Sequence, residues 1–377
     1  MRPIAEQTIL VTGSSDGHGK RVARELAARG ATVLVHGRDR RKTEAAAEEI
    51  GSDRVLVADL ASLDAVRRLA DEIDELDTLV NNAGVIVPER RESADGYELT
   101  FAVNYLSHFL LTQLLLPKLR EPGRIVNVSS IGQAPLDFDD LMLKRDYNAY
   151  LAYAHSKLAQ VMFTIELAER LDGRDITVNA LHPATLMNTK MVTGGGVRPR
   201  SSVEEGVEAT LRLVAAPDLD GVTGRFFDGT RESAADGQAY DADARRRLWE
   251  VSERLTGTVN SRWIVDGMNV IGSRPTGWWR DRRAAMRELV AALRGLGEPV
   301  TVVFDGEPFD LSDEVVDVRF ASRRARGAAD DEIVVLVAEE AEPSRVVTSD
   351  VELAERVRAL GAEVVGAGAF RARLEGW

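Results

Sequence analysis

The chain has 377 residues, of which 44% are hydrophobic and 29% are charged, and it carries a formal net charge of −13. This length suffices for two domains, and the composition is that of a folded globular protein rather than a disordered one. The acidic balance excludes a uniformly basic nucleic-acid-binding protein but leaves room for a local basic patch. The absence of cysteine excludes disulfides, thiolate metal sites and cysteine nucleophiles.

Membrane and export signals are weak in this sequence. The most apolar stretch, residues 109–116, is much shorter than the roughly 20 residues of a membrane-spanning helix. The N-terminus lacks the apolar core of a signal peptide. We therefore expect a cytoplasmic protein with no membrane span.

Short β-branched runs alternate with longer helical patterns along the first two-thirds of the chain. Ser202 and Glu205 add a capping-box pattern that predicts the start of a helix. Such alternation predicts an α/β fold with a parallel sheet covered by helices. We expect strands at residues 8–12, 32–35, 54–57, 78–80, 124–128 and 176–180, and helices at 20–29, 64–73 and 154–171.

The composition changes near residue 262. All five histidines and all six lysines precede it, whereas 16 arginines lie from Arg262 to the end of the chain. A short run of small and polar residues separates a charged helical stretch from a new series of strands at 263–265, 300–304, 315–320 and 345–348. We therefore predict a first domain over residues 1–255, a linker over 256–261 and a smaller α/β domain over 262–377.

The first strand runs into a glycine-rich turn, Gly13-x-x-x-Gly17-x-Gly19, that opens a helix. Glycines let a pyrophosphate approach the backbone, and the helix N-terminus offers it free N–H groups. A glycine turn without a ligand stays the alternative. The second strand ends at Gly37-Arg38, where NAD-selective sites place an acid. Unless Arg38 is only a surface charge, it suits a 2′-phosphate and favours NADP(H) over NAD(H).

Further motifs follow in chain order, ending with Tyr153-x-x-x-Lys157. Together with the glycine turn they resemble the short-chain dehydrogenase/reductase family over about residues 6–255. The resemblance implies a doubly wound Rossmann fold with a seven-stranded sheet. It implies a catalytic set of Asn104, Ser130, Tyr153 and Lys157, and a cofactor site made by Gly13, Ser15, Gly17, His18, Gly19, Arg38, Asp59, Leu60, Asn82, Ala83, Gly84, Tyr153, Lys157, Pro183 and Thr185.

Physical chemistry supports the tyrosine–lysine pair. Tyr153 and Lys157 are four residues apart and share a helix face, and a nearby ammonium lowers the pKa of a phenol from its usual value near 10. A serine hydroxyl orients the substrate oxygen. The residues alone do not decide between Ser129 and Ser130, and the resemblance favours Ser130.

An insertion at residues 136–150 resembles the retinol-dehydrogenase-like branch of the family. That branch implies a small lipophilic alcohol or carbonyl as substrate. Residues 187–200 read as a flap over the substrate. Family members form dimers or tetramers in many cases, so an oligomer is possible.

The second domain has only Asp, Glu, Ser and Thr for chemistry. Asp266, Asp305 and Asp350 stand at strand ends, and Asp330 opens a helix. Carboxylates gathered at one sheet edge suit Mg²⁺ or Mn²⁺, although each is also a typical turn or cap residue. With Asn269, the pattern resembles the NYN branch of PIN-like nucleases over about residues 262–375. This implies endoribonuclease activity or RNA binding.

RNA binding requires positive charge near the phosphates. Two groups of arginines supply it, although a solvated helix face is the alternative. Trp278 and Trp279 are candidates for stacking on bases, or for the core. The arginine groups are Arg280, Arg282, Arg283 and Arg287, and Arg319, Arg323, Arg324 and Arg326.

The sequence thus favours an NADP(H)-dependent oxidoreductase fused to a metal-dependent RNA-processing domain. Three alternatives stay open. In the first alternative, the protein is a nuclease whose first domain senses NADP(H) without turnover, although the complete catalytic set of that domain argues against this. The second domain would bind RNA without cleaving it, or the fusion would join two unrelated activities.

Overall fold

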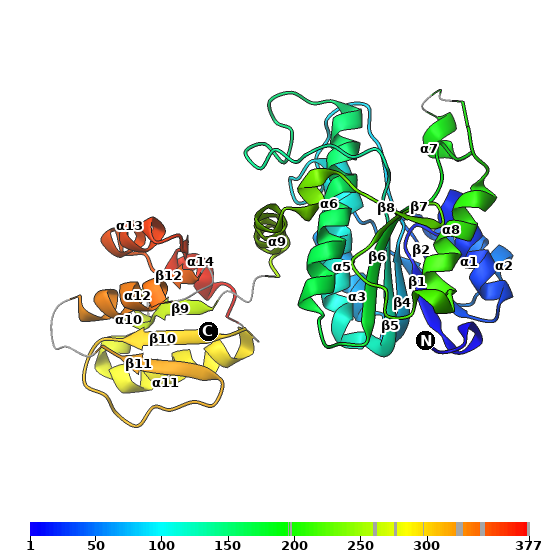
Figure 1. Ribbon diagram of the computed structural model, residues 1–377. Helices are drawn as coiled ribbons and strands as arrows, with labels where there is room; N and C mark the ends of the chain where they lie inside the picture. The colour runs from blue at the N-terminus through cyan, green and yellow to red at the C-terminus, as the bar shows by residue number, and fades with distance from the viewer. Residues whose placement is uncertain are drawn as a thin grey trace. The chain divides into compact units, whose positions relative to one another are not determined.

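The computed structural model describes residues 1–194, 196, 198–258, 262–274, 277–296, 298–321, 327–339 and 344–374 (Figure 1). The chain divides into two compact units, Met1–Thr258 and Val259–Trp377. Each unit contains one sheet with hydrophobic clusters on both faces. Both units are therefore α/β folds, as expected from the alternating pattern.

The sheet of the first unit has the strand order β3-β2-β1-β4-β5-β6-β7-β8. All described pairings are parallel except that of β7 with β8. The expected sheet has seven strands, and β8 is the additional one. A two-residue hairpin turn at Gly229, with φ +58°, returns the chain antiparallel to β7. The strands are β1 Thr8–Val11, β2 Thr32–Gly37, β3 Val55–Val57, β4 Leu76–Asn81, β5 Leu119–Val128, β6 Ile176–His182, β7 Phe226–Asp228 and β8 Arg231–Ser233.

Helices cover both faces of this sheet (Figure 1). Side-chain caps start several of them, and the predicted capping box of Ser202 and Glu205 is present at α8. A π-helical turn, Ala102–Leu106, joins α4 to α5. The helices are α1 Gly17–Ala28, α2 Arg40–Ile50, α3 Leu63–Asp71, α4 Leu99–Phe101, α5 Ser107–Leu115, α6 Ala149–Arg170, α7 Lys190–Thr193, α8 Val203–Ala215 and α9 Ala242–Thr256.

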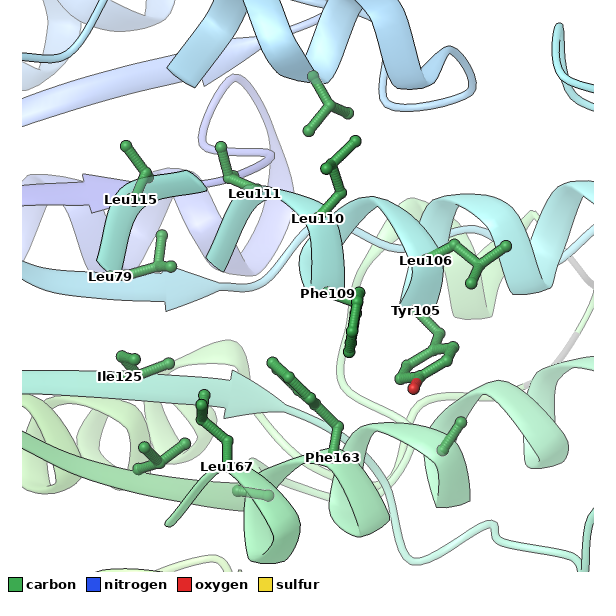
Figure 2. Packing of buried hydrophobic residues seen from close by; sticks show 14 of the residues in the cluster. Leu79, Tyr105, Leu106, Phe109, Leu110, Leu111, Leu115, Ile125, Phe163 and Leu167 are labelled. Carbon is green, nitrogen blue, oxygen red and sulfur yellow. The ribbon is translucent and has the colours of Figure 1, made fainter. Parts of the chain in front are cut away.

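The larger core of the first unit is aromatic. Figure 2 shows Phe109 of α5 and Phe163 of α6 facing each other, with ring centroids 5.3 Å apart. Trp249 of α9 closes the group from outside, 5.1 Å from Phe109. Each such buried aromatic side chain contributes about 2–3 kcal/mol by removing apolar surface from water. This packing fixes α6, which carries Tyr153 and Lys157, against the sheet.

One helical run among the described residues, Leu99–Lys118, is long and apolar enough to span a membrane by length and composition. Within the first unit, 78% of its most apolar window is buried. Core packing accounts for this composition, so the run is only a weak indication of a membrane span.

The second unit has a five-stranded sheet with the order β11-β10-β9-β12-β13, and its described pairings are parallel. The chain builds outward from β9 in one direction and then, from β12, in the other. The carboxyl end of β9 is therefore a topological switch point, the place where such sheets bind ligands. The strands are β9 Trp263–Asp266, β10 Val300–Phe304, β11 Val316–Phe320, β12 Arg345–Val347 and β13 Glu363–Val365, with helices α10 Gly267–Gly272, α11 Arg282–Leu293, α12 Ala328–Glu339, α13 Val351–Ala359 and α14 Ala367–Arg371.

Candidate active site

The glycine turn of the first unit packs directly against the loop that follows β4. A Cβ atom on Gly13, which has φ +66°, would lie 2.9 Å from Ala83 Cα. A Cβ atom on Gly19 would lie 2.3 Å from Asn82 Nδ2. Only glycine therefore allows this close approach, and the turn keeps its backbone open at the carboxyl edge of β1. These glycines form a cradle of the kind that suits a pyrophosphate.

Asn82 and His18 brace this cradle. Asn82 Nδ2 donates to Thr12 O over 2.7 Å, and Asn82 Oδ1 lies 2.9 Å from His18 Nδ1. The other ring nitrogen of His18 lies 3.2 Å from Thr210 Oγ1 on α8. The ring of His18 is thus occupied by protein partners, and burial lowers its pKa. What His18 offers an anion is its backbone N–H near the start of α1.

His36 is a residue of this edge that the sequence analysis missed. Gly13 N–H donates to His36 Nδ1 over 3.1 Å, and His36 Nε2 lies 3.2 Å from Ala58 O. Burial lowers the pKa of His36 to about 4, so the ring is neutral and its Nε2–H donates to the carbonyl. The sequence feature that could have revealed His36 is a polar residue inside an otherwise apolar strand.

The end of β2 leaves no space for a side chain. A Cβ atom on Gly37 would lie 2.4 Å from Thr43 Oγ1 and 2.7 Å from Ser15 Oγ. Arg38 beside it is exposed. A carboxylate is therefore absent, and sterically disfavoured, at the position where NAD-selective sites carry one.

Two further predicted cofactor residues follow β3 with opposite exposures. Asp59 is exposed, and its Oδ1 accepts a hydrogen bond from Ala61 N over 3.0 Å. Leu60 is 5% exposed, and its side chain belongs to the hydrophobic core. Leu60 therefore has only its backbone to offer a ligand.

Tyr153 and Lys157 lie on one face of α6, as the spacing predicts. Lys157 Nζ is 5.5 Å from the centroid of the Tyr153 ring. Burial raises the pKa of Tyr153, and a hydrogen bond from the Ser130 side chain partly offsets this effect. Lys157 is 4% exposed, and burial lowers its pKa to about 7. Ser130, Tyr153 and Lys157 thus meet in one place.

The adjacent residues Ser129 and Ser130 have different roles in the structure. Ser129 Oγ donates to the backbone carbonyl of Lys157 over 2.7 Å, so this hydroxyl ties β5 to α6. Ser130 Oγ accepts from Gly132 N over 3.0 Å and faces Tyr153. The geometry therefore agrees with the choice of Ser130 as the residue near the reacting oxygen.

Asn104 lies in the π-helical turn and is fully buried. Its Oδ1 accepts from Val85 N over 2.7 Å, and its Nδ2 donates to Val85 O and to Ser156 Oγ, each over 3.0 Å. The side chain therefore fastens the loop after Asn82 to α6. Gly84 lies in the same loop, where a Cβ atom would be 3.4 Å from Asn104 Oδ1.

Pro183 and Thr185 follow β6, where the family resemblance places the nicotinamide end of the cofactor. Pro183 is buried, and Thr185 Oγ1 lies 3.1 Å from His182 Nε2. The predicted flap is tied down by Arg200 N–H, which donates to Leu186 O over 3.0 Å. Residues 195 and 197 of this flap lie outside the described residues. A hollow of about 480 Å³ is lined by Leu186, Arg198, Pro199 and Arg200.

Three exposed apolar side chains stand beside the site motifs in the sequence. Ile86, Ile131 and Tyr150 are all exposed although they are large and hydrophobic. Each stands next to a site motif, since Ile86 follows Gly84, Ile131 follows Ser130, and Tyr150 precedes Tyr153 by one helical turn. Exposed apolar groups concentrated in this way mark a surface that binds apolar partners.

The aspartates of the second unit also gather at one sheet edge. Asp266 at the end of β9 is 6% exposed, and Thr348 Oγ1 donates to its Oδ2 over 3.2 Å. Burial raises the pKa of Asp266 to about 6, and the charges of Asp330 and Asp305 add to this rise. Burial and the charges of Asp350 and Asp305 raise the pKa of Asp330. The four predicted metal ligands therefore lie near enough to one another for their charges to interact.

These aspartates also have structural roles. Asp266 Oδ1 accepts from Asn269 N over 3.0 Å and caps α10, and Asp350 Oδ1 accepts from Leu353 N over 2.9 Å and caps α13. Asp305 Oδ1 accepts from Ala329 N over 3.2 Å. Within the described part of the chain, no three His, Asp or Glu side chains form a group that fits a metal ion. The predicted Mg²⁺ or Mn²⁺ site is thus not preformed.

The arginine groups are only partly available to a ligand. Arg283 and Arg287 lie over the ring of Phe309, at 5.1 and 5.2 Å from its centroid. Arg319 Nε donates to Asp317 over 3.0 Å. Trp278 is half-buried, whereas Trp279 is 61% exposed. Arg323, Arg324 and Arg326 lie outside the described residues.

Comparisons with known proteins agree with the site of the first unit. A family model described as short chain dehydrogenase matches residues 7–195. Retinol dehydrogenase 13 of Mus musculus is 40% identical over 283 residues, which cover 67% of this chain and 85% of the mouse protein.

Two solved structures extend this agreement to the fold. An uncharacterised protein of Mycobacterium paratuberculosis is 37% identical with a TM-score of 0.59, covering 67% of this chain and 94% of that one. A short-chain dehydrogenase of Shigella flexneri, complexed with NADP, is 27% identical with a TM-score of 0.50, covering 59% and 97%.

The fold and the site together define a nicotinamide-dependent oxidoreductase that acts on an alcohol or a carbonyl group. The chain belongs to the short-chain dehydrogenase family, and within that family it is similar to the retinol dehydrogenases. None of these matches covers more than 67% of the chain, so the nature of the second unit rests on its own residues.

Proposed function

We propose that the first unit is an NADP(H)-dependent oxidoreductase that interconverts a lipophilic alcohol and its carbonyl, with Tyr153 as the acid/base. The observation that carries this proposal is the meeting of Ser130, Tyr153 and Lys157 at the sheet edge that also holds the glycine cradle. A proton donor, a hydroxyl that orients the substrate oxygen and a cation stand together there.

The residues divide the reaction as follows. The hydroxyl of Tyr153 gives its proton to the carbonyl oxygen during reduction and takes it back during oxidation. Ser130 Oγ holds that oxygen by a hydrogen bond, and the ammonium of Lys157 favours the tyrosinate by charge. Asn104 keeps the loop after Asn82 in place. When bound along the glycine cradle, the nicotinamide cofactor supplies or accepts the hydride.

The preference for NADP(H) rests on the end of β2. Gly37 leaves no space for an acid that would take the ribose hydroxyls, and the exposed Arg38 beside it offers a cation for a 2′-phosphate. The related structure from Shigella flexneri is complexed with NADP, which supports the same choice.

The preference for a lipophilic substrate rests on the exposed apolar side chains of Ile86, Ile131 and Tyr150, each of which stands beside a site motif in the sequence. The retinol dehydrogenases among the relatives are named for an apolar alcohol, which supports this class of substrate.

The test is turnover by the purified full-length chain. We expect NADPH-dependent reduction of aldehydes to become more efficient as their alkyl or polyene chain lengthens, and NADH to support much slower reduction. The Tyr153→Phe variant is the matched control and should be inactive. Equal turnover by this variant would disprove the assignment, and a preference for short polar aldehydes would disprove the substrate class.

A second candidate function concerns the second unit, and we propose that it is a PIN-like, divalent-cation-dependent RNA-processing domain. The observation that favours it is the convergence of Asp266, Asp305, Asp330 and Asp350 at the switch point of a parallel sheet. Buried carboxylates that raise one another's pKa are typical of functional sites, although ion networks also do this. Because no three of them fit a metal as they stand, cation binding would have to draw them together.

The experiment is cleavage of a labelled mixed-length RNA by the full-length chain in Mn²⁺, with and without NADPH. Asp266→Asn is the control, since it keeps the cap on α10 but removes the charge. Cleavage by the wild type alone would support a nuclease, and an NADPH effect would support communication between the units. RNA binding without cleavage would indicate a binding module. The absence of both cleavage and binding would refute an RNA-related function for the second unit.

A further inference from the structure

Lys157 is a buried cation with neutral hydrogen-bond partners. Its Nζ donates to Val128 O over 2.8 Å and to Gln160 Oε1 over 2.9 Å. The titratable groups that interact with it within the described residues are Tyr153 on α6, His108 on α5 and His182 on β6. None of these is a carboxylate, so the ammonium depends on the dipoles of its two acceptors.

Gln160 connects Lys157 to a second buried group. Gln160 Nε2 lies 3.4 Å from His108 Nδ1, and His108 Nε2 lies 3.3 Å from Thr12 Oγ1. Thr12 Oγ1 accepts in turn from the backbone N–H groups of Asn82 and Ala83 over 2.9 and 3.0 Å. A continuous series of hydrogen-bonding groups therefore runs from Lys157 to the loop that borders the glycine cradle.

The charge of Lys157 dictates how the Gln160 amide is oriented. An ammonium requires the amide oxygen of Gln160, which leaves the amide N–H facing His108 Nδ1. Thr12 Oγ1 accepts from two backbone N–H groups, so its hydroxyl donates to His108 Nε2, and His108 Nδ1–H donates to Asn104 O over 3.0 Å. The orientation of the Gln160 amide is therefore set by Lys157, and the ring of His108 packs beside that amide.

We propose that Gln160 is a positioning residue that keeps Lys157 protonated beside Tyr153, with the ring of His108 packed against its amide. The proposal rests on the oxidoreductase function of the first unit. Burial alone would lower the pKa of Lys157, and the Gln160 carbonyl opposes that effect by favouring the charged form. With less charge at Lys157, the pKa of Tyr153 rises and less tyrosinate is present.

The first test measures the protonation of Lys157 directly and does not require enzymatic turnover. The chain has only six lysines, so ¹³C-lysine NMR of the full chain resolves each one, with Lys157→Met for assignment. We expect Lys157 to titrate near neutral pH, and Gln160→Met to lower its midpoint by about one pH unit, the size of one hydrogen bond to a charged group. His108→Phe should lower it less, and the double variant no more than Gln160→Met.

Thr164→Val is the matched control. Thr164 lies one turn further along α6, is equally buried, and its Oγ1 accepts from Asn127 Nδ2 over 2.8 Å. Its hydroxyl donates to the backbone carbonyl of Gln160 over 2.8 Å and not to the side-chain amide that contacts Lys157, so its variant should lower stability without moving the Lys157 midpoint. If Gln160→Met does not fold, Gln160→Asn withdraws the carbonyl while keeping an amide.

The second test uses alcohol oxidation by the same variants. Gln160→Met should move the acidic limb of the kcat/KM pH profile upward, giving about tenfold slower oxidation below that limb. An unchanged Lys157 midpoint, or lower activity with an unshifted profile, would overturn the proposal and leave Gln160 a structural residue. Absence of wild-type turnover would instead refute the proposed function, while the NMR result would still decide the role of Gln160.

Discussion

Replacing Asp266 by Asn should stabilise the second unit at neutral pH. Asp266 is 6% exposed, and burial together with the charges of Asp330 and Asp305 raises its pKa to about 6. Asn keeps an oxygen that accepts from Asn269 N and caps α10, so the change removes mainly the charge.

The magnitude follows from linkage between folding and proton binding. The folded pKa of about 6 exceeds the ordinary value of 3.8 by about two units, and each unit corresponds to about 1.4 kcal/mol. Because the folded pKa is raised, the favourable contribution is present below pH 3.8 and is lost as pH rises to 6. Above pH 6 the carboxylate therefore costs about 3 kcal/mol of unfolding free energy, which Asp266→Asn should recover.

Urea unfolding of the full chain in chelator, at several pH values, measures this effect. Four of the five tryptophans follow residue 262, so tryptophan fluorescence reports mainly on the second unit. Asp281→Asn is the control, because Asp281 caps α11 from an exposed position. Equal stability of wild type and Asp266→Asn at pH 7, or a gain that does not vanish near pH 4, would refute the reasoning.

Three further outcomes test the first unit. Tyr153→Phe should reduce turnover by at least a hundredfold while leaving NADPH affinity, measured by fluorescence titration, nearly unchanged. Ser130→Ala should lower kcat with little effect on melting temperature, whereas Ser129→Ala should lower the melting temperature, because its hydroxyl holds the Lys157 carbonyl. Arg38→Ala should raise the KM for NADPH about tenfold and leave that for NADH unchanged, and equal changes for both cofactors would assign Arg38 to the surface.

The sequence predicts the sheets well because buried parallel strands are short β-branched runs. The strand expected at 300–304 has the same bounds as β10, and most others differ by a few residues at their ends. Strands β7 and β8 of the first sheet and β13 of the second were missed, and each has only three residues. The formation of β7 and β8 depends on pairing with β6 and on the Gly229 turn rather than on composition.

The candidate site, like the sheets, could be predicted from the sequence only in part. Local spacing predicts that Tyr153 and Lys157 share a helix face, and it predicts the glycine turn. Partners from distant segments are not visible in spacing. His36 bonds Gly13 across 23 residues, and Gln160 approaches His108 across 52 residues. Such contacts arise only once the sheet aligns its strand ends at one edge.

Three of these long-range partners are buried histidines that brace the cofactor edge. His18 joins Asn82 to α8, His36 joins Gly13 to Ala58, and His108 joins Thr12 to the π-helical turn. Burial lowers the pKa of all three, to about 4 for His36 and about 3 for His108. The ring of His36 must therefore stay neutral, because its Nδ1 accepts from Gly13 N–H while its Nε2–H donates to Ala58 O.

Lowering the pH should therefore destabilise the first unit and stabilise the second. A histidine with a lowered folded pKa contributes its full stability above the unfolded value of 6.5 and loses it as pH falls. For His36 the loss between pH 6.5 and 4 is about 3 kcal/mol, opposite in sign to the gain from Asp266 over nearly the same range. NADPH affinity should fall only as pH approaches 4, where His36 of the folded protein gains its proton, and His36→Gln, which keeps hydrogen-bonding groups without a proton to gain, should flatten the decline. A decline of equal steepness in His36→Gln would show that protonation of His36 does not limit cofactor binding in acid.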